Sequence, residues 1–378
     1  MNHAKPSMDE GSSSKRQKTT STSFHDEDKE TWVLGVHTLM PYLQKKPEAY
    51  KGTILEDSKG MLPPYCICMG DTRRVRSTTK YFDEGSAVIL NDRMLKANGN
   101  PGRITVAVGT YKGTPIVAFE HQMGSPAAEI IVREMVSNKI MTNEFKLGET
   151  VFNSDAKYVF RVGSAAGINC YNGPEEEKKQ ELRSPVVNAY DCIVASHQVG
   201  ISCADYSAMT GSINSLSLSH VEEVKEKLKK MGYIFQNGWP VLRTDANTVK
   251  LLRSSIEAKL NAFNASRGEG QLKAGKVVCL GNVSKDSLYA ETAEKAFVEL
   301  RRTLDTGCSE MEFATITRVG AHKTMLGDRV KTAMSACILG CIPGDSFAEL
   351  DKSVCSKVTE SALVGTLETL HEISKSHR

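Results

Sequence analysis

Tyr65-Cys-Ile-Cys-Met-Gly70-Asp-Thr-Arg-Arg74-Val75 is an apolar run that ends in a glycine and is followed by two arginines. The apolar residues before Gly70 predict a buried strand. A glycine at the end of a strand lets backbone amides approach an oxyanion, and Arg74 supplies paired donors one turn later. The segment therefore predicts a strand with an anion site at its end. Taken alone, it also fits a plain structural turn.

Short apolar runs rich in Val and Ile alternate with helical stretches along the rest of the chain. This order favours a three-layer α/β/α fold, in which helices flank a mixed and largely parallel central sheet. The predicted strands are Tyr65–Met69, Ala87–Leu90, Ile104–Val108, Pro115–Phe119, Lys157–Val162, Cys192–Ser196 and Gly275–Leu280. The predicted helices are Ala127–Ser137, Ser219–Met231, Asp245–Asn264, Glu291–Leu304, Met311–Val319 and Ser353–Ser374. Asn172–Leu182 and Ala265–Leu272 have no apolar face and are predicted to be surface loops.

The composition is that of a soluble globular protein, since 25% of the 378 residues are charged and 40% are hydrophobic. Residues 1–30 contain almost nothing apolar. They are predicted to form a disordered tail before a single domain of residues 31–378 with surface-loop insertions. A net charge of +3 is too small to indicate nucleic acid or a membrane surface as the main partner. A small anion fits this charge better.

The sequence shows neither a membrane span nor the apolar core of a secretion signal, so a cytoplasmic location is expected. The short basic run from Lys15 to Lys18 leaves nuclear entry as the alternative. The 10 cysteines include no CxxC pair and lie mostly in apolar stretches. They are predicted to be reduced residues of the core.

Two further arginines follow predicted strands. Tyr158-Val-Phe-Arg161-Val-Gly163-Ser164-Ala-Ala-Gly167 carries an arginine from an apolar strand into a loop of small residues. An arginine is costly to bury without a partner, so Arg161 should face a carboxylate or a bound anion. The small residues after it favour phosphate, because they leave amides and a hydroxyl free to donate. Arg93, in Ile89-Leu-Asn-Asp-Arg93, fits a surface residue when it is taken singly.

Taken in order, these motifs resemble those of the nucleoside phosphorylase family, which contains the uridine phosphorylases and the trimeric or hexameric purine enzymes. Gly70-Asp-Thr-Arg-Arg74-Val75 is similar to the Gly-Asp-Pro-x-Arg-Val phosphate loop of that family, and Asn91-Asp-Arg93 to its second phosphate arginine. Met123-Gly-Ser-Pro-Ala127 resembles its Gly-Gly-Pro-Ser helix start, and Arg161-Val-Gly-Ser164 its Arg-x-Gly-Thr motif.

Two more motifs resemble the sugar and base sites of the family. Ser309-Glu-Met311-Glu312-Phe-Ala314 is similar to the ribose motif Tyr-Glu-Met-Glu-Ser-Ala. Ser284-Lys-Asp-Ser-Leu288-Tyr289 is closer to the Ser-Ser-Asp-Thr-Phe-Tyr stretch of uridine phosphorylases than to the purine-enzyme segment. Without the other motifs, Glu310 and Glu312 also fit two exposed carboxylates at a helix start. Leu288 and Tyr289 also fit simple packing.

The resemblance implies the phosphorolysis of uridine or deoxyuridine to free base and (deoxy)ribose 1-phosphate, in nucleoside salvage or catabolism. Inorganic phosphate is then a co-substrate, and no other cofactor is implied. No metal site is expected, because Met94 stands where a cation-binding relative has an acidic residue. The alternatives are a purine nucleoside phosphorylase on the same scaffold, a hydrolytic nucleosidase, and a catalytically weak member that binds phosphate and nucleoside.

The resemblance also assigns roles to individual residues. Catalysis depends on Arg74, Arg93 and Arg161. Phosphate is bound by these three arginines together with Gly70 and Ser164. Ribose is bound by Met311, Glu312, Ser164 and His37, and the base pocket is shaped by Leu288 and Tyr289. Arg93 is donated across a dimer interface, so at least a homodimer is expected, and His37 is a second candidate to cross it. A lone histidine such as His37 also fits a surface residue.

The sequence departs from the family at the base. Uridine phosphorylases carry a glutamine and an arginine a few residues after the aromatic pair, where this chain has Ala290-Glu-Thr-Ala-Glu294. The segment Ala336–Asp345 offers no Asn-Arg or Ser-Asp pair, and Asp345 is its only charged candidate. The sequence therefore supports the phosphate half of the site better than the base half, and it leaves the base open.

Overall fold

The computed structural model of the chain describes residues 32–33, 47–98, 103–136, 140–141, 154–169, 186–201, 229, 234–236, 239–285, 294–321, 330–342 and 350–377. All of them belong to one compact unit, residues 31–378. The predicted tail of residues 1–30 and the predicted loop Asn172–Leu182 lie outside the described residues. Of the predicted helix Ser219–Met231, only Lys229 is described.

Strands and helices alternate along the chain, as predicted. The strands are β1 (Trp32–Val33), β2 (Tyr65–Met69), β3 (Val88–Ile89), β4 (Val106–Tyr111), β5 (Thr114–Glu120), β6 (Ile140–Met141), β7 (Tyr158–Ile168), β8 (Cys192–Ile201), β9 (Ile234–Gln236), β10 (Trp239–Arg243), β11 (Val277–Lys285), β12 (Thr306–Glu310) and β13 (Lys331–Ile342). The helices are α2 (Pro47–Tyr50), α3 (Thr72–Thr78), α4 (Leu90–Asn98), α5 (Ser125–Val136), α9 (Ala246–Ala265), α10 (Glu294–Leu304), α11 (Phe313–Ala321) and α12 (Lys352–Lys375). A 3-10 turn, η1 (Thr79–Tyr81), follows α3.

Strand β7 organises the sheet. Its first residues pair in parallel with β2, and its last residues pair antiparallel with β12. β13 pairs in parallel with β7 along almost its whole length. From β12 the pairing continues through β11 and β8 back to β13, so β7, β12, β11, β8 and β13 close a ring. On the other side of β2, the strands β5, β4 and β3 extend the sheet.

The predicted mixed sheet is confirmed, but more of its pairs are antiparallel than predicted. β4 and β5 form a hairpin with Lys112 and Gly113 at its turn, where the φ angles are 50° and 75°. Two successive positive φ angles are typical of a type I′ turn, whose twist matches that of paired antiparallel strands. Antiparallel pairs also join β3 to β4, β7 to β12, β8 to β13, β8 to β10 and β9 to β10.

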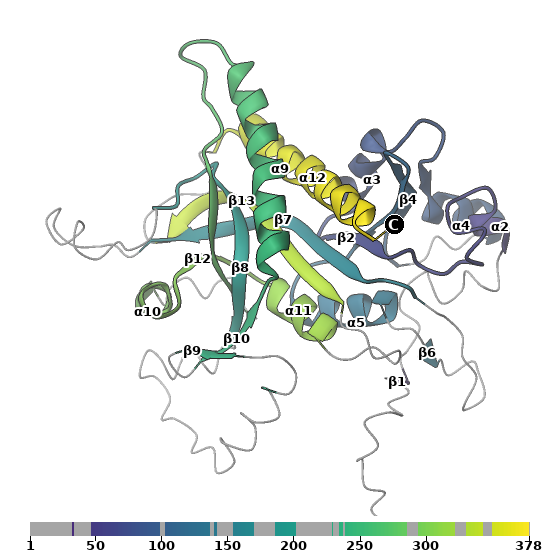
Figure 1. The fold of residues 1–378 in the computed structure, drawn as a ribbon, viewed down its shortest axis with the longest axis horizontal. Helices are drawn as coiled ribbons and strands as arrows, with labels where there is room; N and C mark the ends of the chain where they lie inside the picture. Colours follow the sequence, from purple (N-terminus) through teal and green to yellow (C-terminus); the bar gives the residue numbers. More distant parts are fainter. Residues whose placement is uncertain are drawn as a thin grey trace, which may run out of the picture. The chain divides into compact units, whose positions relative to one another are not determined.

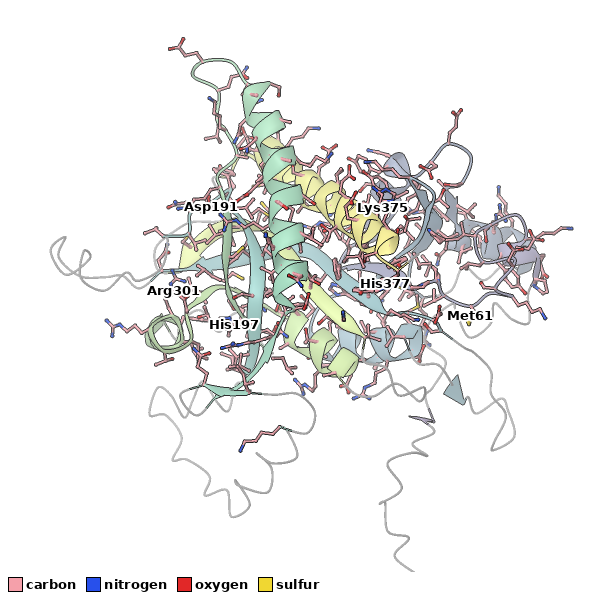
Figure 2. The ribbon with its side chains drawn as sticks, in the orientation of Figure 1. Met61, Asp191, His197, Arg301, Lys375 and His377 are labelled. Carbon is pink, nitrogen blue, oxygen red and sulfur yellow. The ribbon has the colours of Figure 1, made fainter. Side chains whose placement is uncertain are left out.

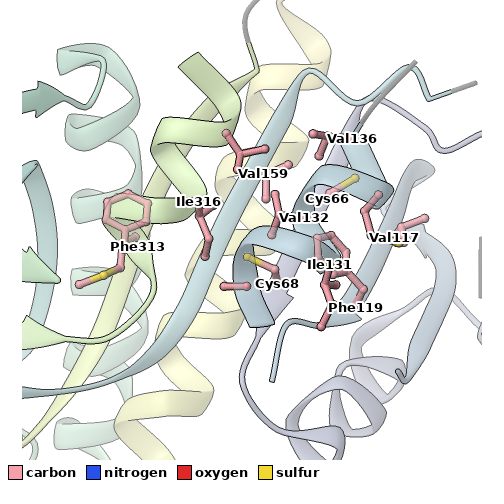
Figure 3. Close-up of a cluster of buried hydrophobic side chains, with 14 of the residues drawn as sticks. Cys66, Cys68, Val117, Phe119, Ile131, Val132, Val136, Val159, Phe313 and Ile316 are labelled. Carbon is pink, nitrogen blue, oxygen red and sulfur yellow. The ribbon is translucent and has the colours of Figure 1, made fainter. Parts of the chain in front are cut away.

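Helices α5 and α11 cover one face of the sheet. Figure 3 shows their side chains Val132 and Ile316 in the same buried cluster as Phe119 of β5 and Val159 of β7. Almost all residues of α11 are buried, as in a helix that the protein encloses on nearly all sides. This packing fixes the start of α5 near the carboxyl end of β5 and the start of α11 near the middle of β7.

Helices α9 and α12 lie side by side over the opposite face (Figure 1). On α12, the buried residues Val354, Val358 and Ala362 recur at every fourth position and pack into the core of this face. Asp351 caps the start of α12 by accepting from the backbone N–H groups of Ser353 and Val354. Just beyond its end, His377 (labelled in Figure 2) is hydrogen-bonded to the Tyr158 hydroxyl at 2.8 Å.

The pattern of apolar residues predicts most elements but not all. Every strand predicted from the sequence is present, and β7, β8 and β11 extend beyond their predicted ends. The strands that were not predicted are β1, β6, β9, β10, β12 and β13. The predicted loop Ala265–Leu272 is confirmed after the first residue, which still belongs to α9.

Two predictions from composition can also be compared with the structure. The cysteines in the described part of the chain carry free thiols, and most of them are buried, as predicted. Among the described residues, no helix is both long enough and apolar enough to cross a membrane.

Gly365 allows α9 and α12 to pack closely. A β-carbon at this position would lie 2.6 Å from Cγ1 and 2.9 Å from the backbone N of Ile256. Gly365→Ala should therefore force the helices apart and lower the free energy of unfolding by about 1–3 kcal/mol. Ser356→Ala, on the exposed side of α12, is the control and should change it by less than about 0.5 kcal/mol. Urea denaturation measures both variants, and equal stabilities would contradict the close packing.

Candidate functional site

The carboxyl ends of β5 and β2 lie side by side and beside the middle of β7, because the three strands are parallel neighbours and β7 continues to Ile168. Continuing their register by one or two residues places Gly70 beside His121 on one side and beside Gly163 on the other. Ligands of α/β sheets bind at the carboxyl ends of the strands. His121, Gly70 and Gly163 thus lie side by side, and we refer to these three residues as the glycine row. They form one side of the candidate site.

The two glycines of this row leave room for larger side chains above the sheet. A β-carbon on Gly163 would lie 2.4 Å from Nη1 of Arg161. A β-carbon on Gly70 would lie 3.5 Å from Cε1 of His121. Arg161, whose side chain is 6% exposed, therefore lies over Gly163, while the ring of His121 borders Gly70.

Arg161 forms a buried ion pair with two carboxylates. Its Nη2 lies 2.5 Å from Oε2 of Glu312 and 3.2 Å from Oε2 of Glu310. Burial alone would lower the pKa of Arg161, but the two carboxylates raise it, so the guanidinium keeps its charge. Nε and Nη1 of Arg161 have no hydrogen-bond partner among the described residues. The carboxylate partner that the sequence analysis offered for Arg161 is thus present, and two donor nitrogens remain for an anion.

Glu312 joins Arg161 to the loop before α5. Its Oε1 accepts from the backbone N–H of Gly124 at 2.8 Å. Burial alone would raise the pKa of Glu312, but Arg161 and the Gly124 N–H lower it, so the group is a carboxylate. Glu310 and Glu312 are each 5% exposed. The alternative interpretation, in which both are exposed carboxylates at a helix start, is therefore wrong.

Glu310 is a residue to which the sequence analysis assigns no role, yet it fixes the position of Glu312. Its Oε2 accepts from the backbone N–H groups of Glu312 and Phe313 at 2.8 and 2.9 Å, at the start of α11. Asn282 and Ser284 of β11 donate to its Oε1. Burial raises the pKa of Glu310, while Arg161 and these donors oppose that rise. Glu310 therefore caps α11 and sets the direction in which Glu312 points.

Met311 lies at the same corner of the site. The Ser125 hydroxyl donates to the Met311 carbonyl oxygen at 2.6 Å. Gly124 has a φ angle of 88°, and a β-carbon there would lie 3.9 Å from Cε of Met311. The structure thus brings Met311 and Glu312 together with Arg161, and their assignment to ribose stays a prediction.

Arg74 approaches the site from α3. Asp71 caps this helix by accepting from the Arg73 backbone N–H at 2.6 Å. Burial and then the charge of Arg161 lower the pKa of Arg74, so the two guanidinium groups lie within electrostatic range. Within the described part of the chain, the Arg74 guanidinium has no ion pair. The assignment of Arg74 to phosphate stays a prediction.

Ser164 follows Arg161 by three residues. Side chains alternate along a strand, so Ser164 faces the opposite side of β7, in register with Cys337 of β13. The pKa of Arg74 responds to Cys337 as well as to Arg161. Ser164 therefore does not share the face of β7 that Arg161 occupies, and its contact with phosphate stays a prediction.

The remaining predicted residues are not part of this cluster in a single chain. Arg93 lies on α4, and its Nη1 donates to the carbonyl oxygen of Lys51. His37, Leu288 and Tyr289 lie outside the described residues. The predicted roles of these four residues stay predictions.

No family model matches the chain, and no curated protein matches its sequence. Among solved structures, a uridine phosphorylase of the oomycete Phytophthora capsici matches with a TM-score of 0.53 and 14% identity, over 82% of this chain and 90% of that one. The fold resembles that of a uridine phosphorylase.

Two other solved structures also match, each at 18% identity and over 82% of this chain. They are a Trypanosoma brucei nucleoside phosphorylase that shows uridine phosphorylase activity, with a TM-score of 0.49 over 94% of that chain, and a Vibrio fischeri uridine phosphorylase, with a TM-score of 0.48 over 92% of that chain. The likeness to the Phytophthora uridine phosphorylase confirms the predicted fold.

His121 is a second residue of this uridine phosphorylase-like fold that the sequence analysis missed. Its ring is fully buried. Burial, and then the charge of Arg161, lower its pKa to about 3. No local pattern marks this histidine, because it follows a buried strand as many turn residues do.

The low pKa of His121 should make the protein sensitive to mild acid. A histidine with a folded pKa below its unfolded value of 6.5 binds fewer protons when the protein is folded. Its contribution to stability is therefore complete above pH 6.5 and falls as the pH drops towards 3, by about 1.4 kcal/mol per pH unit. His121→Gln should show a shallower loss of the free energy of unfolding between pH 7 and pH 5. Urea denaturation in phosphate-free buffer measures this slope, and identical slopes in the two proteins would contradict the assignment.

Proposed function

We propose that the chain is a nucleoside phosphorylase whose substrate is uridine or deoxyuridine. An oxygen of hydrogen phosphate attacks C1′ of the sugar, while the bond from C1′ to N1 of the base breaks. The electron pair of that bond goes to the base, which takes up the proton of the hydrogen phosphate and leaves as uracil. The observation that carries the proposal is the buried Arg161–Glu312 pair. In this pair, a guanidinium suited to binding phosphate lies beside a carboxylate suited to accepting hydrogen bonds from sugar hydroxyls.

Arg161 and Arg74 bind the phosphate in this proposal. Glu312 holds Nη2 of Arg161, whereas Nε and Nη1 have no partner among the described residues and are available to an anion. Arg74 adds a second positive charge nearby, and a dianion between the two groups offsets their repulsion. A guanidinium that is already fixed needs no reorganisation as the phosphate oxygen attacks.

Glu312 and Met311 hold the ribose. Each carboxylate oxygen has two lone pairs. Oε2 of Glu312 accepts one hydrogen bond from Arg161, and Oε1 accepts one from the Gly124 N–H. The remaining lone pairs accept from the 2′- and 3′-hydroxyls of the sugar. The flexible thioether of Met311 packs against the sugar face. Because Glu312 orients both Arg161 and the sugar, it sets the distance from the phosphate to C1′.

The remaining parts of the proposal rest on the sequence resemblance. Arg93 supplies a third phosphate contact across an interface, so the active enzyme is at least a homodimer in which His37 also reaches the neighbouring sugar. Ser164 contacts phosphate and sugar, and Leu288 and Tyr289 line the base pocket. A preference for uracil is supported by the Ser284–Tyr289 segment and by the likeness to the Phytophthora uridine phosphorylase. The enzyme acts in nucleoside salvage in the cytoplasm.

A phosphate-dependent assay tests the proposal. The purified full-length chain is assayed for base release from uridine, deoxyuridine, thymidine, inosine and adenosine, with and without phosphate. Arg74→Ala should lower kcat/KM for uridine by about 100-fold and raise KM for phosphate, because one charge-assisted contact is lost. Arg74 suits this test better than Arg161, since removing Arg161 would leave two buried carboxylates without their cation.

Arg253→Ala is the matched control. Arg253 is an exposed arginine of α9 that pairs with Glu257, and its loss should leave kcat/KM unchanged. Uracil release that requires phosphate and Arg74 supports the proposal. Purine release would indicate a purine nucleoside phosphorylase, and release without phosphate a hydrolase. No release from any nucleoside would indicate a binding protein.

A further inference from the structure

His121 has hydrogen-bonding capacity that the described residues do not meet. The side chain is 0% exposed, and neither Nδ1 nor Nε2 has a hydrogen-bond partner among the described residues. The carbonyl oxygen of Gln122 is close enough to affect the pKa of the ring but does not meet hydrogen-bond geometry. Burying a polar group without a partner is unfavourable, and buried polar groups in proteins are nearly always hydrogen-bonded. The His121 ring therefore needs a hydrogen-bond partner that the described residues do not supply.

The ring of His121 lies close to the cationic group of Arg161. His121 ends the glycine row, beside Gly70 and across the two glycines from the guanidinium of Arg161. Arg161 is close enough to lower the pKa of His121, and on the same guanidinium Nε and Nη1 have no partner among the described residues. Because both intervening positions are glycines, no side chain from either of them separates the His121 ring from the Arg161 guanidinium.

We infer that His121 is an anion ligand, whose ring N–H donates a hydrogen bond to an oxygen of the phosphate held by Arg161 and Arg74. The inference rests on the proposed phosphorylase function and adds a residue that neither the sequence motifs nor the resemblance assigns to the site. Glycine at position 70 leaves the ring uncrowded, because a β-carbon there would lie 3.3 Å from the Gln122 carbonyl oxygen and 3.5 Å from the ring.

The protonation state of the ring fits this role. Arg161 and burial keep the imidazole neutral at physiological pH. A neutral imidazole carries one N–H donor and one acceptor nitrogen. It therefore adds a directed hydrogen bond to the phosphate without adding a further positive charge beside Arg161 and Arg74. Glu310 and Glu312, the acidic groups that pair with Arg161, contact Nη2 of that guanidinium and leave Nε and Nη1 to the phosphate.

Phosphate binding by the full-length chain, measured by calorimetry without a nucleoside, tests the inference independently of turnover. His121→Phe keeps the ring volume and removes the donor, and it should weaken phosphate binding about tenfold. His121→Gln keeps an N–H donor and should bind phosphate within about threefold of the wild-type affinity. His197→Gln is the control, because His197 is a partly buried histidine whose ring contacts the Leu304 carbonyl oxygen at 2.6 Å. It should leave the affinity unchanged.

A phosphate affinity of His121→Phe equal to that of the wild type would overturn the inference and leave the proposed function standing. Absence of phosphate binding by the wild-type chain itself would overturn both. If His121→Phe does not fold, nuclear magnetic resonance of the wild-type chain with nitrogen-15-labelled histidine decides the question. The His121 ring signals, recognised by their low pKa, should shift on addition of phosphate, and unchanged signals at saturating phosphate would reject the inference.

Discussion

The buried ion pair between Arg161 and Glu312 is the interaction on which the candidate site depends. It joins β7 to the start of α11, and the second oxygen of Glu312 joins both to the loop before α5 through Gly124. Glu310 stabilises this arrangement, because it caps α11 and also contacts Arg161. Loss of one partner from a buried pair typically costs about 3–5 kcal/mol. The guanidinium, the carboxylate and the starts of two helices are therefore positioned as one unit.

The topology of the sheet explains how these residues meet. β7 pairs with β2 as far as Arg161, and then with β12 at Ala166 and Gly167. This change of partner brings Glu310, at the end of β12, against the middle of β7. Gly163 provides the space in which the Arg161 side chain can turn towards it. The direct pairing of β12 with β7 therefore assembles this part of the site.

The features that depend on local pattern could be predicted from the sequence. Apolar runs marked the strands around the site, and the motifs placed Gly70 and Glu312 next to the ends of strands, where the structure has them. Arg161 was expected to end its strand but lies inside β7, which continues to Ile168. β12 was missed because Thr306–Glu310 is short and partly polar, and its burial comes from neighbours far along the chain. The roles of Glu310 and His121 were missed for a related reason. The role of Glu310 depends on donors from β11, and that of His121 depends on hydrogen bonds that the described residues do not supply.

In the proposed site, phosphate lies between Arg161 and Arg74, beyond the carboxyl end of β2 and beside the middle of β7. A crystal structure of the full-length chain grown with phosphate tests this claim most directly. The account predicts tetrahedral density within hydrogen-bond distance of Nε or Nη1 of Arg161 and of the Arg74 guanidinium, with Glu312 still bonded to Nη2. Phosphate bound elsewhere, or an Arg74 side chain paired with a carboxylate while this edge of the sheet stays empty at saturating phosphate, would contradict it.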